Sequence, residues 1–206
     1  WITAGAGWDQ AALEAPNTRG SVQLAALPET YQPVLALALS PDGNRLAIGR
    51  GNRLFVHDLQ ATNFTVLLAT NAAIDALRSV AWSPDGQRLA VGAKDGTLRI
   101  WDLPTQRLAR TLVGQAEGQA QWVNDAVWLP GGRIAAAGND LTVRLWDAEA
   151  GRSLAVFHGH TGSVTSIAAS PDGRRLFTGA GDGTLRAWDL EALDPRRWTW
   201  PLEGSA

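Results

Sequence analysis

The sequence predicts an all-β fold of consecutive four-stranded units, and three observations support that prediction. First, one sequence motif occurs four times with small changes, and its fullest copy, SPDGQRLAVGAKDGTLRIWD, occupies residues 83–102. Second, the four copies end on Asp58, Asp102, Asp147 and Asp189, so the repeat has a nearly constant period. Third, polar and apolar residues alternate between turns rich in Gly, Pro and Asp, which is typical of short β-strands. A period in the low forties with four strands per unit indicates the blades of a β-propeller.

The turns define the elements of each unit. In the second unit, Pro84 stands where a turn favours a preset φ, and Gly96 where a turn favours positive φ. The strands of this unit are therefore predicted at 78–83, 88–93, 97–102 and 106–113. The others are predicted at 34–39, 45–49, 52–57 and 64–69, at 122–128, 133–137, 141–146 and 152–157, and at 163–169, 174–179, 184–188 and 196–200. A β-sandwich of short strands would not explain the same turn chemistry recurring at one period.

The chain divides into a short leading segment and a propeller segment. Residues 1–20 are predicted to be a short helix or coil at the end of an upstream domain, followed by a Pro/Asn/Gly linker. Residues 21–206 are predicted to form a partial ring of four blades, which begins with a strand at 21–27. The blades are expected at about 34–71, 76–114, 121–159 and 160–202. Because the chain contains no methionine, we expect it to belong to a longer protein.

Composition excludes several classes of function. A formal net charge of −2 argues against a basic surface for nucleic acid. No apolar stretch is long enough to span a membrane. Without cysteine there is no disulfide and no thiolate metal site, and we expect no cofactor in these residues. Lys94 is the only lysine among 18 basic residues, and this arginine bias with abundant Ala, Leu and Gly favours a bacterial origin.

The repeats resemble the WD-repeat β-propeller family over most of the chain. The resemblance rests on the closing Trp-Asp pairs, such as Trp188-Asp189, and on the Gly159-His160 dipeptide that opens the fourth unit. In that family each blade holds a hydrogen-bonded tetrad of His, Ser/Thr, Asp and Trp. The resemblance implies a structural tetrad of His160, Thr178, Asp182 and Trp188 in the fourth unit.

The first three units lack a complete tetrad. The second and third keep the Asp and Trp positions but replace the hydroxyl by Val91 and Ala136, and the first has His57 in place of the Trp. Since a buried polar network must be satisfied or absent, these blades should depend more on apolar packing.

Several polar residues invite a catalytic or ligand-binding interpretation, and each has a simpler one. The tetrad explains His160, Thr178 and Asp182 without a catalytic triad, and no third ligand recurs beside His57 and His158 to make a metal site. Three arginines recur two residues before the blade tryptophans: Arg99, Arg144 and Arg186. We interpret them as apolar stems at the blade edge with solvated heads, rather than as a phosphate-binding ring.

Loop residues are the better candidates for function. In this architecture the loops that enter the first strand and those that join the second to the third share one face. These loops supply the partner-binding candidates, which are Arg50, Lys94, Trp122, Asn124 and Asn139. Aromatic and arginine side chains are common interface anchors, although Trp122 is also interpretable as a cap on its own blade.

The first residues carry a second resemblance. WITAGAGWD, at residues 1–9, is similar to the last helix of the c-type cytochrome domains that precede WD-repeat propellers in planctomycetes and their relatives. That resemblance implies a haem motif upstream of Trp1, no haem in this chain, and an exported or periplasmic parent protein.

We therefore predict a non-catalytic protein-interaction scaffold, a propeller module of a larger bacterial protein attached to a c-type cytochrome domain. One alternative is a propeller enzyme of the hydrolase or dehydrogenase type, for which only Asp75 and Asp125 stand as non-repeating carboxylates near strand starts. A second alternative is a purely structural spacer. A protein partner is expected, without nucleic acid or membrane contact in this segment.

Overall fold

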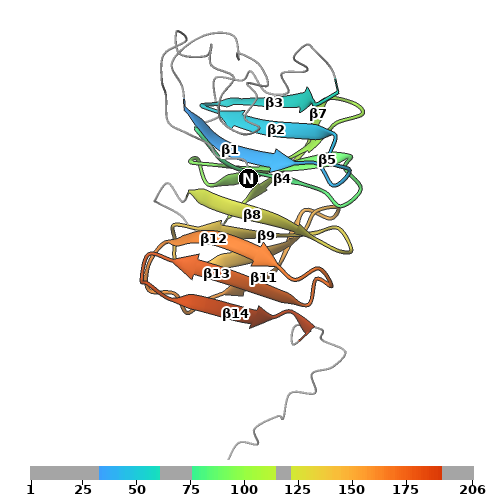
Figure 1. The fold of residues 1–206 in the computed structure, drawn as a ribbon. Helices are drawn as coiled ribbons and strands as arrows, with labels where there is room; N and C mark the ends of the chain where they lie inside the picture. The colour runs from blue at the N-terminus through green and yellow to red at the C-terminus, as the bar shows by residue number, and fades with distance from the viewer. Residues whose placement is uncertain (1–32, 61–75, 115–121, 192–206) are drawn as a thin grey trace, which may run out of the picture.

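The described residues of the chain form four antiparallel sheets in sequence order (Figure 1). The computed structural model describes residues 33–60, 76–114 and 122–191, and these ranges contain no α-helix. The first sheet consists of β1 (Val34–Leu39), β2 (Arg45–Arg50) and β3 (Arg53–Asp58). The second consists of β4 (Leu77–Trp82), β5 (Arg88–Ala93), β6 (Thr97–Asp102) and β7 (Arg107–Val113). The third consists of β8 (Val123–Leu129), β9 (Arg133–Gly138), β10 (Val143–Asp147) and β11 (Arg152–Phe157), and the fourth of β12 (Val164–Ala169), β13 (Arg175–Ala180) and β14 (Leu185–Asp189).

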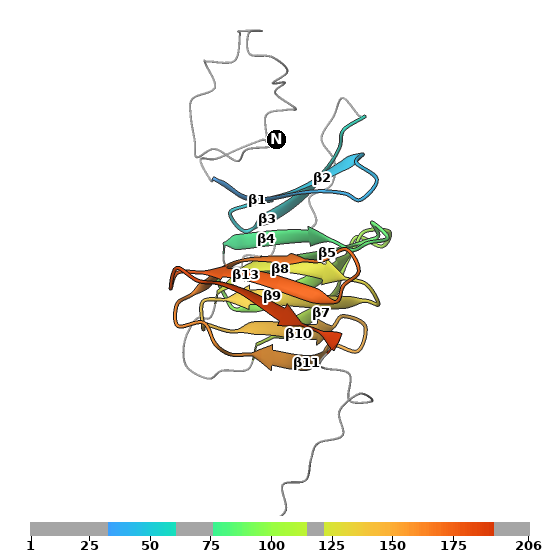
Figure 2. The same ribbon diagram turned by 60° about the horizontal axis from the view of Figure 1, so that its bottom comes forward.

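Each sheet is a simple meander, and the sheets follow one another about a common axis (Figures 1 and 2). The first strand of each sheet packs against the first strand of the next, so that β1 contacts β4, β4 contacts β8 and β8 contacts β12. The strands within the described ranges form an arc of a propeller and not a closed ring. The predicted all-β partial propeller is confirmed.

The predicted strands agree closely with the structure, with one correction. The third strand of the third unit was expected from residue 141, but β10 begins at Val143. Leu141 lies in the turn with a φ of +70°, a conformation in which the other units use glycine. The expected strands at 21–27, 64–69 and 196–200 and the leading segment 1–20 lie outside the described residues.

Apolar side chains fill each junction between consecutive sheets. We call the face of a sheet that looks toward the next sheet in the chain its forward face. At the second junction, Leu98 and Ile100 from the forward face of the second sheet pack with Trp128 and Trp146 of the third sheet. Equivalent clusters fill the first and third junctions. The tryptophans that close the second, third and fourth units therefore pack against the preceding sheet.

No described residue covers the forward face of the fourth sheet. Leu185 on this face is 78% exposed, whereas its equivalents in the three earlier sheets, Leu54, Leu98 and Val143, are at most 1% exposed. Phe177, where the three earlier sheets carry alanine, is also exposed. The fourth sheet thus presents the apolar surface that inner sheets bury.

Two tryptophans at the ends of first strands also join neighbouring sheets. The indole Nε1 of Trp82 donates to the carbonyl oxygen of Ala38 at 2.8 Å, and that of Trp128 donates to Ala81 at 3.1 Å. The Arg45 guanidinium lies over the Trp82 ring and donates to the Gly86 carbonyl oxygen at 2.7 Å. These contacts add directional polar interactions to junctions that are otherwise apolar.

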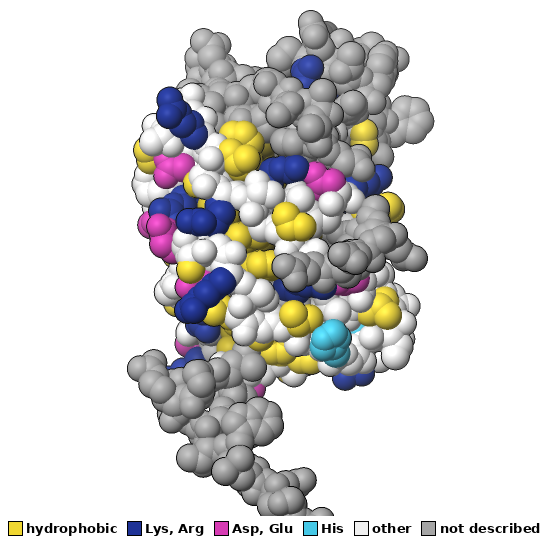
Figure 3. All heavy atoms as spheres, turned by 180° about the vertical axis from the view of Figure 1, so that it is seen from behind, with side chains coloured by type: hydrophobic (Ala, Val, Ile, Leu, Met, Phe, Trp, Pro, Cys, Tyr) yellow, Lys and Arg dark blue, Asp and Glu magenta, His cyan; other side chains and the backbone are white. Residues whose placement is uncertain are grey.

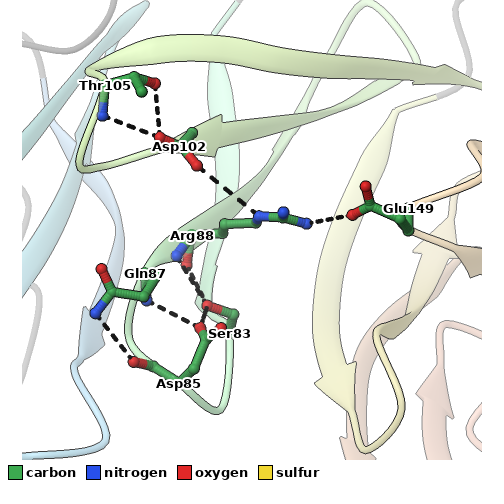
Figure 4. Close-up of polar contacts among 7 residues, drawn as sticks. All are labelled: Ser83, Asp85, Gln87, Arg88, Asp102, Thr105 and Glu149. Carbon is green, nitrogen blue, oxygen red and sulfur yellow. Dashed lines mark hydrogen bonds and ion pairs between the residues drawn. The ribbon is translucent and has the colours of Figure 1, made fainter.

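Arg88 links the second and third sheets at their solvent edge (Figure 4). Its Nη1 lies 2.8 Å from Oε2 of Glu149, in the turn between β10 and β11, and its Nε lies 4.0 Å from Oδ2 of Asp102 in its own sheet. The turn before it is closed by Ser83, whose Oγ accepts from the Arg88 amide at 2.8 Å and donates to Asp85 at 2.6 Å. Because Glu149 is largely exposed, this ion pair contributes little to stability.

Positive and negative side chains are interspersed on the face in Figure 3, with no broad field of one sign. This agrees with the small net charge. Among the described residues, no helix is long and apolar enough to cross a bilayer.

Candidate functional site

The structure brings the four tetrad side chains of the fourth sheet together. His160 precedes β12, Thr178 is on β13, Asp182 is in the turn to β14, and Trp188 is on β14. The imidazole Nε2 lies 2.8 Å from Oγ1 of Thr178, and Nδ1 lies 3.2 Å from Oδ2 of Asp182. The indole Nε1 of Trp188 donates to Oγ1 of Thr178 at 2.9 Å. The four residues therefore form one continuous chain of hydrogen bonds.

The partners determine the proton positions in this chain. The Thr178 oxygen accepts the indole proton, so its own proton is available for Nε2 of His160. The imidazole then carries its proton on Nδ1, which faces Oδ2 of Asp182 at 3.2 Å and Oγ1 of Thr184 at 3.0 Å. The His160 side chain is fully buried and Thr178 is 1% exposed, so no substrate atom has access to the hydroxyl. The arrangement locks the loop before β12 onto the sheet and does not resemble an exposed nucleophile.

Asp182 is the most heavily hydrogen-bonded carboxylate of the tetrad sheet. Its Oδ1 accepts from the hydroxyl of Thr184 at 2.6 Å and its Oδ2 from the amide of Thr161 at 2.8 Å. The Thr184 hydroxyl, followed by the Thr161 amide, holds the pKa of Asp182 well below its ordinary value, and His160 adds to the effect. The carboxylate is therefore charged at neutral pH.

We expect the contribution of Asp182 to stability to disappear in acid. A group whose pKa is depressed by folding stabilises the protein above its unfolded pKa, here 3.8, and loses that contribution as the pH falls toward the folded value. Urea unfolding of the wild type and Asp182→Asn at pH 7, 5, 4 and 3 tests this. The stability difference should be largest at pH 7 and shrink below pH 4. A difference that is constant with pH would contradict the assigned role.

The second and third sheets use the turn aspartate differently. Arg99 Nη2 lies 2.7 Å from Oδ2 of Asp95, and Nη1 of Arg144 pairs with Oδ2 of Asp140. The arginine side chains are only 13% and 15% exposed. The prediction of solvated heads is therefore wrong for Arg99 and Arg144. Because the described parts of these units place no histidine beside the turn, the nearest cation binds its carboxylate.

Three of the predicted partner-binding residues lie together at one end of the second and third sheets. The Trp122 ring is flanked by Nζ of Lys94, 4.8 Å from its centroid, and by the Arg78 guanidinium carbon at 5.2 Å. The amide of Asn139 donates to the Trp122 carbonyl oxygen at 3.0 Å. We call Arg78, Lys94, Trp122 and Asn139 the rim cluster. All four are partly exposed.

A repeated backbone contact positions this cluster. In each of the last three sheets, the residue before the turn aspartate donates its amide to the residue that enters the first strand. The pairs are Lys94 with Ala76, Asn139 with Trp122, and Gly181 with Ser163. The strand entry and the turn between the second and third strands are thereby held at the same end of the sheet.

The other two predicted residues lie elsewhere. Asn124 donates through Nδ2 to the carbonyl oxygen of Val164 at 2.9 Å and to Oγ of Ser163 at 3.2 Å, so it joins the third and fourth sheets. Arg50 ends β2 in the first sheet, where it is cross-strand from Val34. The structure therefore does not place Asn124 or Arg50 in the rim cluster.

Sequence reasoning missed Arg78, Trp82 and Trp128. Arg78 lies at the register shift between Leu77 and Ser79 in β4 and contacts Trp122 of the next unit. Asn124 lies at the equivalent shift in β8 and likewise reaches the next sheet. The signal for Trp82 and Trp128 was available, because both stand just before the turn that follows the first strand. These positions differ in the first and fourth units, which have Leu39 and Ala169.

Asp125, one of the two carboxylates considered for an enzyme, is engaged in the junction between sheets. Its Oδ2 accepts from the Ile167 amide of the fourth sheet at 3.0 Å, and its Oδ1 accepts from the Ala126 amide at 2.9 Å. Burial raises the pKa of Asp125. Asp75 lies outside the described residues. The described chain contains no group of three or more His, Asp or Glu side chains that could hold a metal ion.

Four consecutive antiparallel sheets about one axis, one of them with a buried His-Thr-Asp-Trp network, define a repeat protein of the propeller class. The family model "WD domain, G-beta repeat" matches residues 67–102, 107–147 and 151–189, more than half of the chain. The chain belongs to the WD-repeat family. The matches end on the closing aspartates, and the first sheet extends the same architecture ahead of them.

Curated relatives come from several eukaryotes. The chain is 36% identical over 184 residues to Protein groucho of Drosophila melanogaster, covering 89% of this chain and 19% of that protein. It is 34% identical over 105 residues to the Target of rapamycin complex subunit wat1 of Schizosaccharomyces pombe, covering 50% and 32%. It is 28% identical over 188 residues to the APC/C activator protein CDC20 of Saccharomyces cerevisiae, covering 89% and 28%. The chain thus spans less than a third of the length of each of these relatives.

Proposed function

We propose that this chain is a non-catalytic protein-interaction module and that the rim cluster is its partner-binding surface. The observation that carries the proposal is Trp122, an aromatic ring held between two cations at the end of the sheets where loops meet. Aromatic and cationic side chains are enriched among residues that dominate binding energy. The ring costs little conformational entropy to immobilise, because the Asn139 amide holds the Trp122 backbone and two cations flank the indole.

The names of the relatives support an interaction role. One is called a subunit of a complex and another an activator protein. The tetrad hydroxyl is buried, and both oxygens of Asp125 accept backbone hydrogen bonds. These observations favour a binding module over the enzyme alternative.

Charge reversal in the rim cluster tests the proposal. The full-length parent carrying Lys94→Glu or Arg78→Glu is expressed in its native host, and the proteins captured with it are quantified against the wild type. We expect at least one specific partner to be depleted by both variants. The matched control is Arg107→Glu, an exposed arginine on the outer strand β7, which should retain that partner. Unchanged capture by folded Lys94→Glu and Arg78→Glu proteins would favour the structural-spacer alternative.

The context of the module stays a prediction. The similarity of residues 1–9 to the end of a c-type cytochrome domain supports the interpretation of an exported bacterial parent protein. Haem staining of the full-length parent and its recovery from the periplasm would test that interpretation.

A further inference from the structure

Arg186 is the one member of the recurring arginine trio without an acidic partner among the described residues. Arg99 and Arg144, in the same register on β6 and β10, pair with Asp95 and Asp140. The equivalent acid in the fourth sheet is Asp182, four residues before Arg186, yet no hydrogen bond or ion pair joins them within the described chain.

The tetrad explains the difference. The Oδ2 atom of Asp182 faces the His160 imidazole and the Thr161 amide, and Oδ1 accepts from Thr184. In the second and third sheets the corresponding Oδ2 atom binds the arginine. Completion of the tetrad therefore takes from Arg186 the carboxylate that neutralises its two counterparts.

Arg186 and Arg144 share one feature of their surroundings. A glycine after the outer strand of the preceding sheet lies against each guanidinium, Gly114 beside Arg144 and Gly159 beside Arg186. A Cβ on Gly159 would lie 3.0 Å from Nη1 of Arg186, so a side chain there would crowd the guanidinium. The junction thus has the form of an arginine–carboxylate site, and its carboxylate is engaged elsewhere.

A buried donor in this site is unsatisfied. The Nε atom of Arg186 is inaccessible to solvent and has no hydrogen-bond partner, while the residue as a whole is partly exposed. Buried hydrogen-bonding groups are nearly always paired, so an unpaired one needs an explanation. Nη1 of Arg99 is also buried without a hydrogen-bond partner, but Asp95 neutralises that guanidinium, whereas no acidic side chain of the described residues pairs with Arg186. The planar guanidinium fork matches a carboxylate, which can bind two N–H groups at once.

We propose that Arg186 binds a glutamate or aspartate side chain of a partner protein at the junction of the third and fourth sheets. The argument is charge complementarity: the partner supplies the carboxylate that Asp95 and Asp140 supply within the second and third sheets. This contact is separate from the rim cluster and does not depend on it. It gives the fourth sheet a recognition role that follows from its complete tetrad.

The test is an NMR titration of the 206-residue chain, in which the side-chain Nε–Hε signals of Arg186, Arg144 and Arg99 are assigned with Arg→Lys variants. The probe is the blocked peptide acetyl-Glu-Glu-Glu-amide, with acetyl-Gln-Gln-Gln-amide as the uncharged control. We expect a saturable shift of the Arg186 signal with the glutamate peptide alone, and none for Arg144 or Arg99. Arg186→Lys should abolish the peptide-dependent shifts of neighbouring backbone amides, including that of Gly159.

A matched variant tests whether an arginine responds because it lacks a neutralising carboxylate. Asp140→Asn keeps the turn acceptor but removes the charge that neutralises Arg144, so the Arg144 signal should become responsive to the glutamate peptide. The proposal is overturned if the Arg186 signal is silent, or if all three arginines respond equally. It is also overturned if inorganic phosphate shifts the Arg186 signal and the glutamate peptide does not, because the site would then bind a free anion.

Discussion

Leu98→Ala is expected to lower the free energy of unfolding by about 2–5 kcal/mol, the range for truncating a buried leucine. Leu98 is 1% exposed and packs with Trp128 and Trp146 across the junction of the second and third sheets. Removing its branched end leaves a cavity that two rigid indoles cannot collapse to fill. Equilibrium urea denaturation followed by far-UV circular dichroism measures the loss.

The repeat supplies a matched control. Leu185 occupies the same register as Leu98 but is 78% exposed on the forward face of the fourth sheet. Leu185→Ala should change the free energy of unfolding by no more than about 0.5 kcal/mol, as is usual for a surface position. If both variants lost the same stability, the forward face of the fourth sheet would be covered in solution, contrary to the structure. Repeating the measurement over a range of protein concentrations would then show whether a second copy covers it.

Thr178→Val is expected to cost about 1–3 kcal/mol of stability, the usual effect of leaving buried hydrogen-bonding groups unpaired. Valine keeps the shape and volume of threonine but removes the oxygen that accepts from Trp188 and bonds to Nε2 of His160. Both nitrogens would then be buried without that partner. Urea denaturation followed by tryptophan fluorescence reports the change at the indole itself.

The control for this prediction is Thr178→Ser, which keeps the oxygen and loses one methyl group. It should retain most of the stability, because the hydrogen-bond chain through His160 survives. A Thr178→Val protein as stable as the serine variant would show that the polar network contributes nothing beyond packing. In that case the fourth sheet would be stabilised by apolar packing, as the first three sheets are.

The strands were predictable because their determinants are local. Alternation and turn residues such as Gly96 act over a few positions, and they recur at one period. The start of β10 was missed because Leu141 takes a positive φ that its side chain does not suggest. Arg78 was missed for a related reason, since a register shift in β4 turns it toward Trp122, which is far from it in sequence.

By itself, the sequence determined the sheets, their order and the residue types in each register, because strand period and turn chemistry depend on near neighbours. Only the tertiary structure decided which neighbouring groups the side chains in each register contact. Leu98 and Leu185 share a register, but one is covered by the following sheet and the other is not. Arg144 and Arg186 also share a register, each four residues after an aspartate. His160, which lies 22 residues from Asp182, binds that aspartate and leaves Arg186 unpaired, because a carboxylate in a crowded junction binds the donors that the fold brings closest.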